Sequence, residues 1–174
     1  LARFLSLYFQ RTVRWAKPVA KKFPFRWWGR KPYLRKQYHT DPILAHVVHR
    51  IPWDAKAVMA ITHQGIYPGA ERNFVFGLAV PSHRVGILSL ARFSPRFFGA
   101  TPTQTDQKKS LLRAMKTLAH EVGHLLGLHH CVAYACLMSG TNNLPEADAH
   151  PLHLCPVCLA KLAWSLGFDV GKRY

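Results

Sequence analysis

The sequence predicts an α+β fold, because stretches with the apolar spacing of helices alternate with short apolar runs of strand length. Three observations carry this prediction. Residues 105–127 form a long amphipathic stretch, residues 73–80 and 84–93 are two β-rich runs joined by Pro81-Ser82-His83, and residues 57–62 are a short apolar run. A chain of 174 residues is long enough to bury one core, so we expect a single compact domain over residues 1–174.

Four helices are expected where apolar residues recur every three or four positions, at residues 1–16, 42–50, 105–127 and 159–166. Pro42 suits the first turn of the second helix. Thr105 or Asp106 can cap the third helix, and Gly127 can end it. Strands are expected at residues 57–62, 73–80 and 84–93, the last two as a hairpin. Residues 17–26, 94–105 and 128–158 are predicted to be irregular.

The positive charge is concentrated in the first forty residues. The chain has 24 Lys and Arg against 8 Asp and Glu, a net charge of +16, and residues 1–40 hold eleven of the basic residues and none of the acidic ones. Aromatic residues alternate with these charges. Such a segment can contact nucleic acid or an anionic membrane surface, or it can be a solvated face whose aromatics pack on the domain. The other 134 residues are only mildly basic, so the charge does not exclude an enzyme.

The longest predicted helix ends in the pattern HExxHxxGxxH, from His120 to His130. Residues i and i+4 share one face of a helix, so His120 and His124 can reach the same zinc ion. A third ligand ten residues after the first cannot come from the same straight helix. The chain must turn back first, which Gly127 permits, and His130 then reaches the third position. His129 is the alternative third ligand.

Three neutral imidazoles leave a fourth position on zinc for water, as in catalytic zinc sites. Glu121 follows the first ligand and is placed to take a proton from that water and pass it to a leaving amine. The motif therefore predicts hydrolysis of peptide bonds by a zinc enzyme. The alternative is that the histidines and Glu121 are ordinary surface residues of a helix.

Four cysteines form a second set, as two close pairs with 18 residues between them: Cys131, Cys136, Cys155 and Cys158. This spacing predicts a closed, tetrahedral thiolate site for a structural zinc. The alternative is two disulfide bonds, which would suit a secreted protein. Because Cys131 directly follows His130, a structural zinc would also fix the chain that delivers the third histidine. We therefore expect two Zn²⁺ ions, one catalytic and one structural.

The pattern from His120 to Cys131, continued by Cys136, Met138, Cys155 and Cys158, resembles the archaemetzincins, a branch of the metzincin zinc peptidases. The resemblance covers residues 33–174 and includes residues 35–38 and 73–77. It implies a metzincin-like zincin fold: a twisted mixed β-sheet, a backing helix and an active-site helix within residues 41–130. The basic segment 1–40 would precede this part. A small C-terminal part, residues 131–174, would hold the Met-turn and the four-cysteine zinc site.

The resemblance also implies roles for individual residues. The catalytic zinc would lie on His120, His124 and His130, with Glu121 as the general base, and the structural zinc on the four cysteines. Met138 would be the Met-turn residue beneath the catalytic metal. A strand edge beside the cleft, able to bind an extended peptide by strand addition, would consist of Asn73, Phe74, Val75, Phe76 and Gly77.

Two functions from different classes follow. The first is a zinc metallopeptidase acting on peptide or protein substrates, with endopeptidase and aminopeptidase action both open. The second is a basic zinc-binding module that engages nucleic acid or an anionic membrane surface, with little or no peptidase activity. No apolar run approaches the ~18 residues of a membrane-spanning helix, and we expect a cytoplasmic monomer. Because the chain begins with Leu1 and not Met, we expect its natural N-terminus to lie upstream.

Overall fold

The computed structural model describes residues 1–19, 37–69 and 72–173. In chain order the helices are α1 (Ala2–Phe9), α2 (Thr40–Val48), α3 (Gln104–Leu125), α4 (Leu144–Ala149) and α5 (Pro156–Leu166). The strands are β1 (Gln37–His39), β2 (Val58–Thr62), β3 (Gly65–Tyr67), β4 (Gly77–Val80) and β5 (Val85–Ser89). The predicted α+β class is confirmed. No helix in this described part is both long and apolar enough to span a membrane.

The sheet is mixed, as the metzincin resemblance implied. β5 lies at the centre of a three-stranded sheet, with β2 parallel on one side and β4 antiparallel on the other. β1 and β3 form a parallel pair, and a bridge between Ile66 and Val75 links β3 to the chain just before β4. Every residue of β5 is buried, as expected for a strand with both faces covered.

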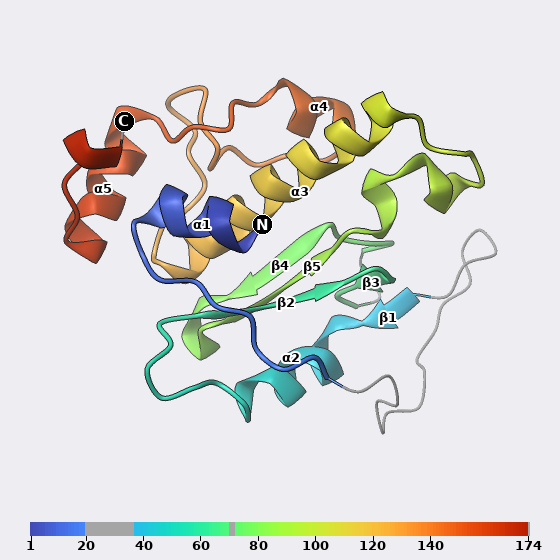
Figure 1. Cartoon of the computed structure of the whole chain (residues 1–174), viewed down its shortest axis with the longest axis horizontal. Helices are drawn as coiled ribbons and strands as arrows, with labels where there is room; N and C mark the ends of the chain where they lie inside the picture. Colours follow the sequence, from blue (N-terminus) through green and yellow to red (C-terminus); the bar gives the residue numbers. More distant parts are fainter. Residues whose placement is uncertain (20–36, 70–71, 174) are drawn as a thin grey trace.

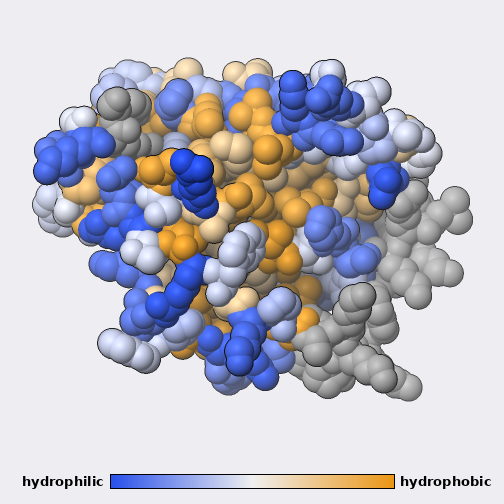
Figure 2. Space-filling view, in the orientation of Figure 1, coloured by the Kyte–Doolittle hydropathy of each residue, from blue (hydrophilic) through white to orange (hydrophobic). Residues whose placement is uncertain are grey.

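Helices cover both faces of this sheet (Figure 1). Leu118 of α3 packs with Leu88 of β5 and Phe9 of α1 in the larger apolar cluster. On the opposite face, Leu44 of α2 packs with Ile87 of β5. α2 is therefore the backing helix, and α3 crosses the face that carries the site. Figure 2 shows hydrophobic residues gathered across the middle of the viewed face, with hydrophilic residues around them.

The two ends of α3 are set by local chemistry. The predicted caps, Thr105 and Asp106, are wrong: Thr103 caps the helix and forms a capping box with Asp106. The Thr103 hydroxyl accepts from the Asp106 N–H at 3.2 Å, and the Asp106 carboxylate accepts from the Thr103 N–H at 2.9 Å. Only Thr103 has an acid three residues later, which is the signature of this motif. At the other end Gly127, with φ of +93°, allows the chain to turn back, as predicted.

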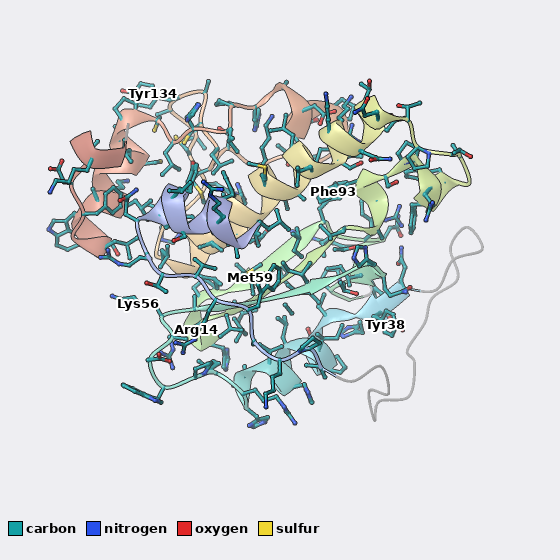
Figure 3. All side chains as sticks on the ribbon, in the orientation of Figure 1. Arg14, Tyr38, Lys56, Met59, Phe93 and Tyr134 are labelled. Carbon is teal, nitrogen blue, oxygen red and sulfur yellow. The ribbon has the colours of Figure 1, made fainter. Side chains whose placement is uncertain are left out.

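The first helix is shorter than the predicted 1–16. α1 ends at Phe9, because Gln10 adopts the left-handed conformation with φ of 51°. The chain then runs without regular structure, and Arg14 forms an ion pair with Asp54 at 2.6 Å (Figure 3). Residues 20–36 of the basic segment lie outside the described residues. The predicted contact of this segment with nucleic acid or membrane therefore stays a prediction.

Other boundaries shift for identifiable reasons. The predicted hairpin forms, but regular pairing begins at Gly77 and ends at Ser89. α5 begins at Pro156 and not at residue 159, because the Cys155 sulfur caps it by accepting the Cys158 N–H at 3.4 Å. β1, β3 and α4 were not predicted. Elements of three to six residues are too short to show an apolar period.

Candidate active site

Three histidines meet at the C-terminal end of α3. Their ligand atoms all lie within 4.8 Å of one another. The Nε2 atoms of His120 and His124, one helical turn apart, are separated by 3.0 Å. After the turn at Gly127, the ring of His130 lies 5.3 and 4.9 Å from the other two rings, measured between centroids. The structure thus brings together the three predicted ligands, and within the described chain His129 is outside this group.

Backbone carbonyl groups orient the two helical histidines. The Nδ1–H of His120 donates to the Leu137 carbonyl at 2.8 Å, and that of His124 donates to the Leu128 carbonyl at 2.7 Å. Burial lowers the pKa of His120 to about 4 and also lowers the pKa of His124, so both rings are neutral near pH 7. This is the protonation state of a metal ligand.

These orientations create a requirement for a cation. With each Nδ1 carrying the proton, both Nε2 atoms offer lone pairs, and they face each other at 3.0 Å. Two such acceptors repel unless a cation lies between them. Nitrogens bound at ~2.1 Å to a tetrahedral zinc ion lie roughly 3.4 Å apart, which is close to the observed separation. The three histidines therefore fit a zinc ion.

Glu121 projects from α3 toward β4 and is only 9% exposed. Burial raises the pKa of Glu121 to about 7, against the opposing effect of a hydrogen bond from the Ala79 backbone. A carboxyl group that titrates near neutrality can both accept and release a proton in one cycle. A cation on the histidines would favour its charged form.

The absence of a side chain at Gly77 leaves room for the carboxyl group of Glu121. A Cβ atom at position 77 would lie 2.6 Å from the Cγ of Glu121 and 2.7 Å from its Oε1. Non-bonded atoms do not approach so closely, so a side chain there must displace either the carboxyl group or β4. Gly77 therefore belongs to the site through its lack of a side chain.

A cavity of about 1000 Å³ extends from the histidines along α3. Residues 72–77 form one wall and the chain between residues 137 and 151 forms much of the other. Phe76 stacks on Phe93 with ring centroids 5.5 Å apart, which makes part of the wall apolar. Phe93 lies between α3 and the sheet (Figure 3). Tyr134, on the loop between two of the cysteines, also lines the cavity but was not predicted, since a single loop tyrosine has no spacing signal.

The predicted edge segment, Asn73 to Gly77, lies along this cavity over its whole length. Its hydrogen-bonding edge is partly used by the protein itself. The N–H of Val75 donates to the Ile66 carbonyl at 3.1 Å, and the carbonyl of Phe76 accepts from the Ser89 N–H at 2.8 Å. An extended peptide could therefore pair only with those backbone N–H and carbonyl groups of this segment that do not make these hydrogen bonds.

Met138 packs directly against α3, at the helical turn between His120 and His124. It is fully buried, and a Cβ atom at Gly123 would lie 2.6 Å from its sulfur. The carbonyl of Met138 accepts from the Cys131 N–H at 2.9 Å. This residue thus packs against the histidine-bearing turn of α3 and also holds the chain after His130.

The four cysteines gather beside this turn. Their sulfur atoms lie within 4.8 Å of one another, and none forms a disulfide bond. Cys131 and Cys155 have sulfurs 3.8 Å apart, which matches the ~3.8 Å between thiolates bound at ~2.3 Å to a tetrahedral zinc. A disulfide bond would need about 2.05 Å. Burial raises the pKa of the Cys136 and Cys158 thiols, so the group does not ionise together without a cation. The site fits a closed thiolate-bound metal.

Basic side chains of α3 hold α4 and with it the second wall of the cavity. Arg113 donates to both carboxylate oxygens of Asp148, at 2.7 and 2.6 Å. Lys116 donates to the carbonyl groups of Ala147, Asp148 and His150 at the C-terminal end of α4. Carbonyl groups at a helix C-terminus carry partial negative charge, which favours a cation there. The wall is therefore fixed relative to His120, one turn further along α3.

The Arg113–Asp148 pair is expected to stabilise the fold measurably. Replacing Arg113 by Met should lower the free energy of unfolding by about 1.5–3 kcal/mol at pH 7, because the side chains are 15% and 25% exposed and doubly hydrogen bonded. Arg113 lowers the pKa of Asp148 in the folded state. Its contribution is thus present above the ordinary carboxyl pKa near 4 and is lost as the pH falls toward the lowered value.

Urea unfolding at pH 7 checks this expectation, with Lys109→Met as the control. Lys109 contacts the same carboxylate at 3.2 Å, but its side chain is 53% exposed. We expect a loss below about 1 kcal/mol for this variant. Equal losses for the two variants would contradict the stabilising role of Arg113.

A mixed sheet with a backing helix, and a helix that ends beside three clustered histidines, defines the zincin class of metallopeptidases. Residues 51–164, more than half of the chain, match the family model described as "Peptidase family M54". The chain belongs to peptidase family M54, the archaemetzincins. The predicted family and the metzincin-type fold are thereby confirmed.

Named relatives support this assignment. Archaemetzincin-2 of Rattus norvegicus is 41% identical, over 79% of this chain and 45% of that protein. The chain therefore spans less than half the length of this relative. A zinc-dependent peptidase from Methanocorpusculum labreanum superimposes with a TM-score of 0.74 at 27% identity, over 92% of this chain and 90% of that one. Archaemetzincin from Methanopyrus kandleri gives a TM-score of 0.63 at 28% identity, over 80% and 74%.

Proposed function

We propose that this chain is a peptidase domain that hydrolyses peptide bonds with water, using a zinc ion on His120, His124 and His130. The observation that carries this proposal is the meeting of three imidazole nitrogens within 4.8 Å, beside a buried carboxyl group and a long cavity. The zinc-dependent peptidase of M. labreanum supports zinc as the metal, because its fold is shared over most of both chains. Membership of a peptidase family supports peptide or protein substrates.

The zinc ion would supply Lewis-acid activation of water and of the substrate carbonyl group. Glu121 accepts the proton released by water and returns it to the leaving amine. Burial between α3 and β4 raises the pKa of the carboxyl, which favours uptake of the proton, while a cation on the histidines would lower the pKa and favour its release. The peptide lies in the cavity between residues 72–77 and the wall that α4 supports. Phe74 and Phe76 offer apolar contacts to its side chains.

A second zinc ion on Cys131, Cys136, Cys155 and Cys158 would be structural, because four protein ligands leave no open position. The backbone supports this assignment. The sulfur of Cys136 accepts N–H groups from Met138 and Cys155, at 3.4 and 3.2 Å, which stabilises a thiolate. Such a site would hold the chain that carries His130 in place.

Replacing Gly77 by Ala is expected to lower kcat about 100-fold, because the added methyl group displaces Glu121 from the reacting water by an ångström or so. Steady-state cleavage of a peptide substrate, with zinc content measured on the same samples, checks this. Gly69→Ala is the matched control, since nothing lies within 4 Å of a Cβ atom there. Wild-type activity in the Gly77 variant would show that Glu121 does not act from the observed position.

The proposed function is tested by incubating the purified chain with a peptide library and identifying the products by mass spectrometry. We expect defined cleavage sites that disappear when a chelator removes the metal and return with added zinc. The distribution of the new termini also separates endopeptidase from aminopeptidase action. Products that are unchanged by chelator would exclude the proposed chemistry.

A further inference from the structure

A buried polar network lies behind the cavity wall, outside the residues used by the proposed mechanism. Gln37, the first residue of β1, is only 1% exposed. In the amide orientation that satisfies its neighbours, its NH2 group donates to the Asn73 carbonyl at 2.9 Å and its oxygen accepts from the Arg92 guanidinium. A Cβ atom at Gly65 on β3 would lie 3.1 Å from the Gln37 Cγ, so the glutamine fits closely against its neighbouring strand.

Arg92 is partly buried in this network, and no carboxylate of the described residues pairs with it. In the described part of the chain, its guanidinium takes part in no salt bridge. Its charge lies instead over the ring of Phe74, 3.8 Å from the centroid, and near that of Phe97, at 4.8 Å. Its Nε is buried without a hydrogen-bond partner among the described residues. Among the described residues, the contacts of this guanidinium are therefore two aromatic rings and the amide oxygen of Gln37, and its nearest ring is that of Phe74 in the cavity wall.

Both side chains contact the same short segment. Gln37 donates a hydrogen bond to the backbone carbonyl of Asn73, and the guanidinium of Arg92 lies over the ring of Phe74. The following residues, Val75 and Phe76, are held differently, by backbone hydrogen bonds to Ile66 and Ser89. The first two residues of the predicted edge segment therefore depend on side chains that come from β1 and from the turn after β5.

We propose that Gln37 and Arg92 are positioning residues, which fix Asn73 and Phe74 in the cavity wall and thereby set how a peptide substrate binds there. This inference rests on the proposed peptidase function. It assigns a role to two residues 84 and 29 positions before Glu121 in the sequence. Glu121 itself is placed by Gly77 and Ala79, so loosening the wall at Asn73 should affect substrate binding more than the chemical step.

Two variants separate this role from general stability. Gln37→Glu keeps the size of the side chain and its contact with Arg92, now as an ion pair, but replaces the donor to the Asn73 carbonyl by an oxygen. Gln37→Met removes both hydrogen bonds. We expect KM for a peptide substrate to rise about 5- to 30-fold in each, the loss typical of one or two buried hydrogen bonds. We expect kcat to stay within about twofold and the zinc content to stay unchanged. Gln107→Met, at an exposed position on α3, is the control.

Amide hydrogen exchange provides a readout that does not depend on catalysis. Exchange should accelerate in peptides covering residues 72–77 and stay slow in those covering β5. If the wild-type chain cleaves no peptide, the proposed function fails. Faster exchange at residues 72–77 in the Gln37 variants would still support the inference that Gln37 and Arg92 fix this part of the cavity wall. Unchanged KM and unchanged exchange would overturn the inference. Loss of zinc, or loss of amide protection over the whole chain, in both Gln37 variants would overturn it as well, because the network would then be only structural.

Discussion

Replacing Glu121 by Gln is expected to abolish peptide cleavage and to leave the metal content unchanged. The amide fits the same space beside Gly77, but it cannot accept a proton from water. Loss of a general base typically lowers the rate about 10²- to 10⁴-fold. The hydrogen bonds that orient His120 and His124 come from backbone carbonyl groups and not from Glu121, so the metal should remain bound. Single-turnover peptide cleavage and elemental analysis of the same sample measure both effects.

Glu146→Gln is the matched control, since Glu146 is an exposed acid on α4 that does not line the cavity. It should retain wild-type cleavage. A Glu121 variant with wild-type kcat would remove the general-base role. A variant that loses both zinc and activity would show that Glu121 maintains the metal site instead of acting on water.

Replacing Cys136 by Ser is expected to destabilise the C-terminal part strongly and to lower activity indirectly. Cys136 is fully buried and accepts two backbone N–H groups. Structural zinc contributes about 10–16 kcal/mol in small zinc-binding peptides, so one of four ligands corresponds to a loss on the order of 3 kcal/mol. Because Cys131 follows His130 and its N–H binds Met138, a loosened cluster should also displace the third histidine.

Denaturant unfolding with zinc analysis measures this effect. Val132→Ser is the control, because Val132 lies in the same loop and is 98% exposed. We expect one zinc per chain in the Cys136 variant, or fewer, and near-normal behaviour in the control. Unchanged stability and zinc content would argue against a thiolate metal site. Fewer than four free thiols in the unreduced, denatured protein would favour the disulfide alternative.

The site was predictable where its chemistry is local in the sequence. His120 and His124 share a helix face because of their spacing, and Gly127 marks the turn that delivers His130. The cysteine pairs follow at a fixed spacing, whereas the role of Met138 was implied only by the resemblance to the archaemetzincins. The long amphipathic period of α3 and the apolar hairpin strands indicated the fold class for the same reason.

Features that depend on distant pairing were not predictable. β1 and β3 are three residues long and are defined only by their pairing with each other. The end of α1 depends on the backbone conformation of Gln10, while the apolar spacing continues past it. The contacts of Gln37 with Asn73 and Arg92 join segments more than thirty residues apart, and nothing in either local pattern indicates them.

The most direct measurement is peptide cleavage as a function of zinc bound per chain, starting from protein whose chelator-accessible metal has been removed. With one zinc per chain, held by the four cysteines, we expect a folded protein without activity. Activity should then rise in proportion to the second equivalent and reach its maximum at two zinc ions per chain. Full activity with only one zinc ion per chain, or none at two, would contradict a catalytic metal on His120, His124 and His130.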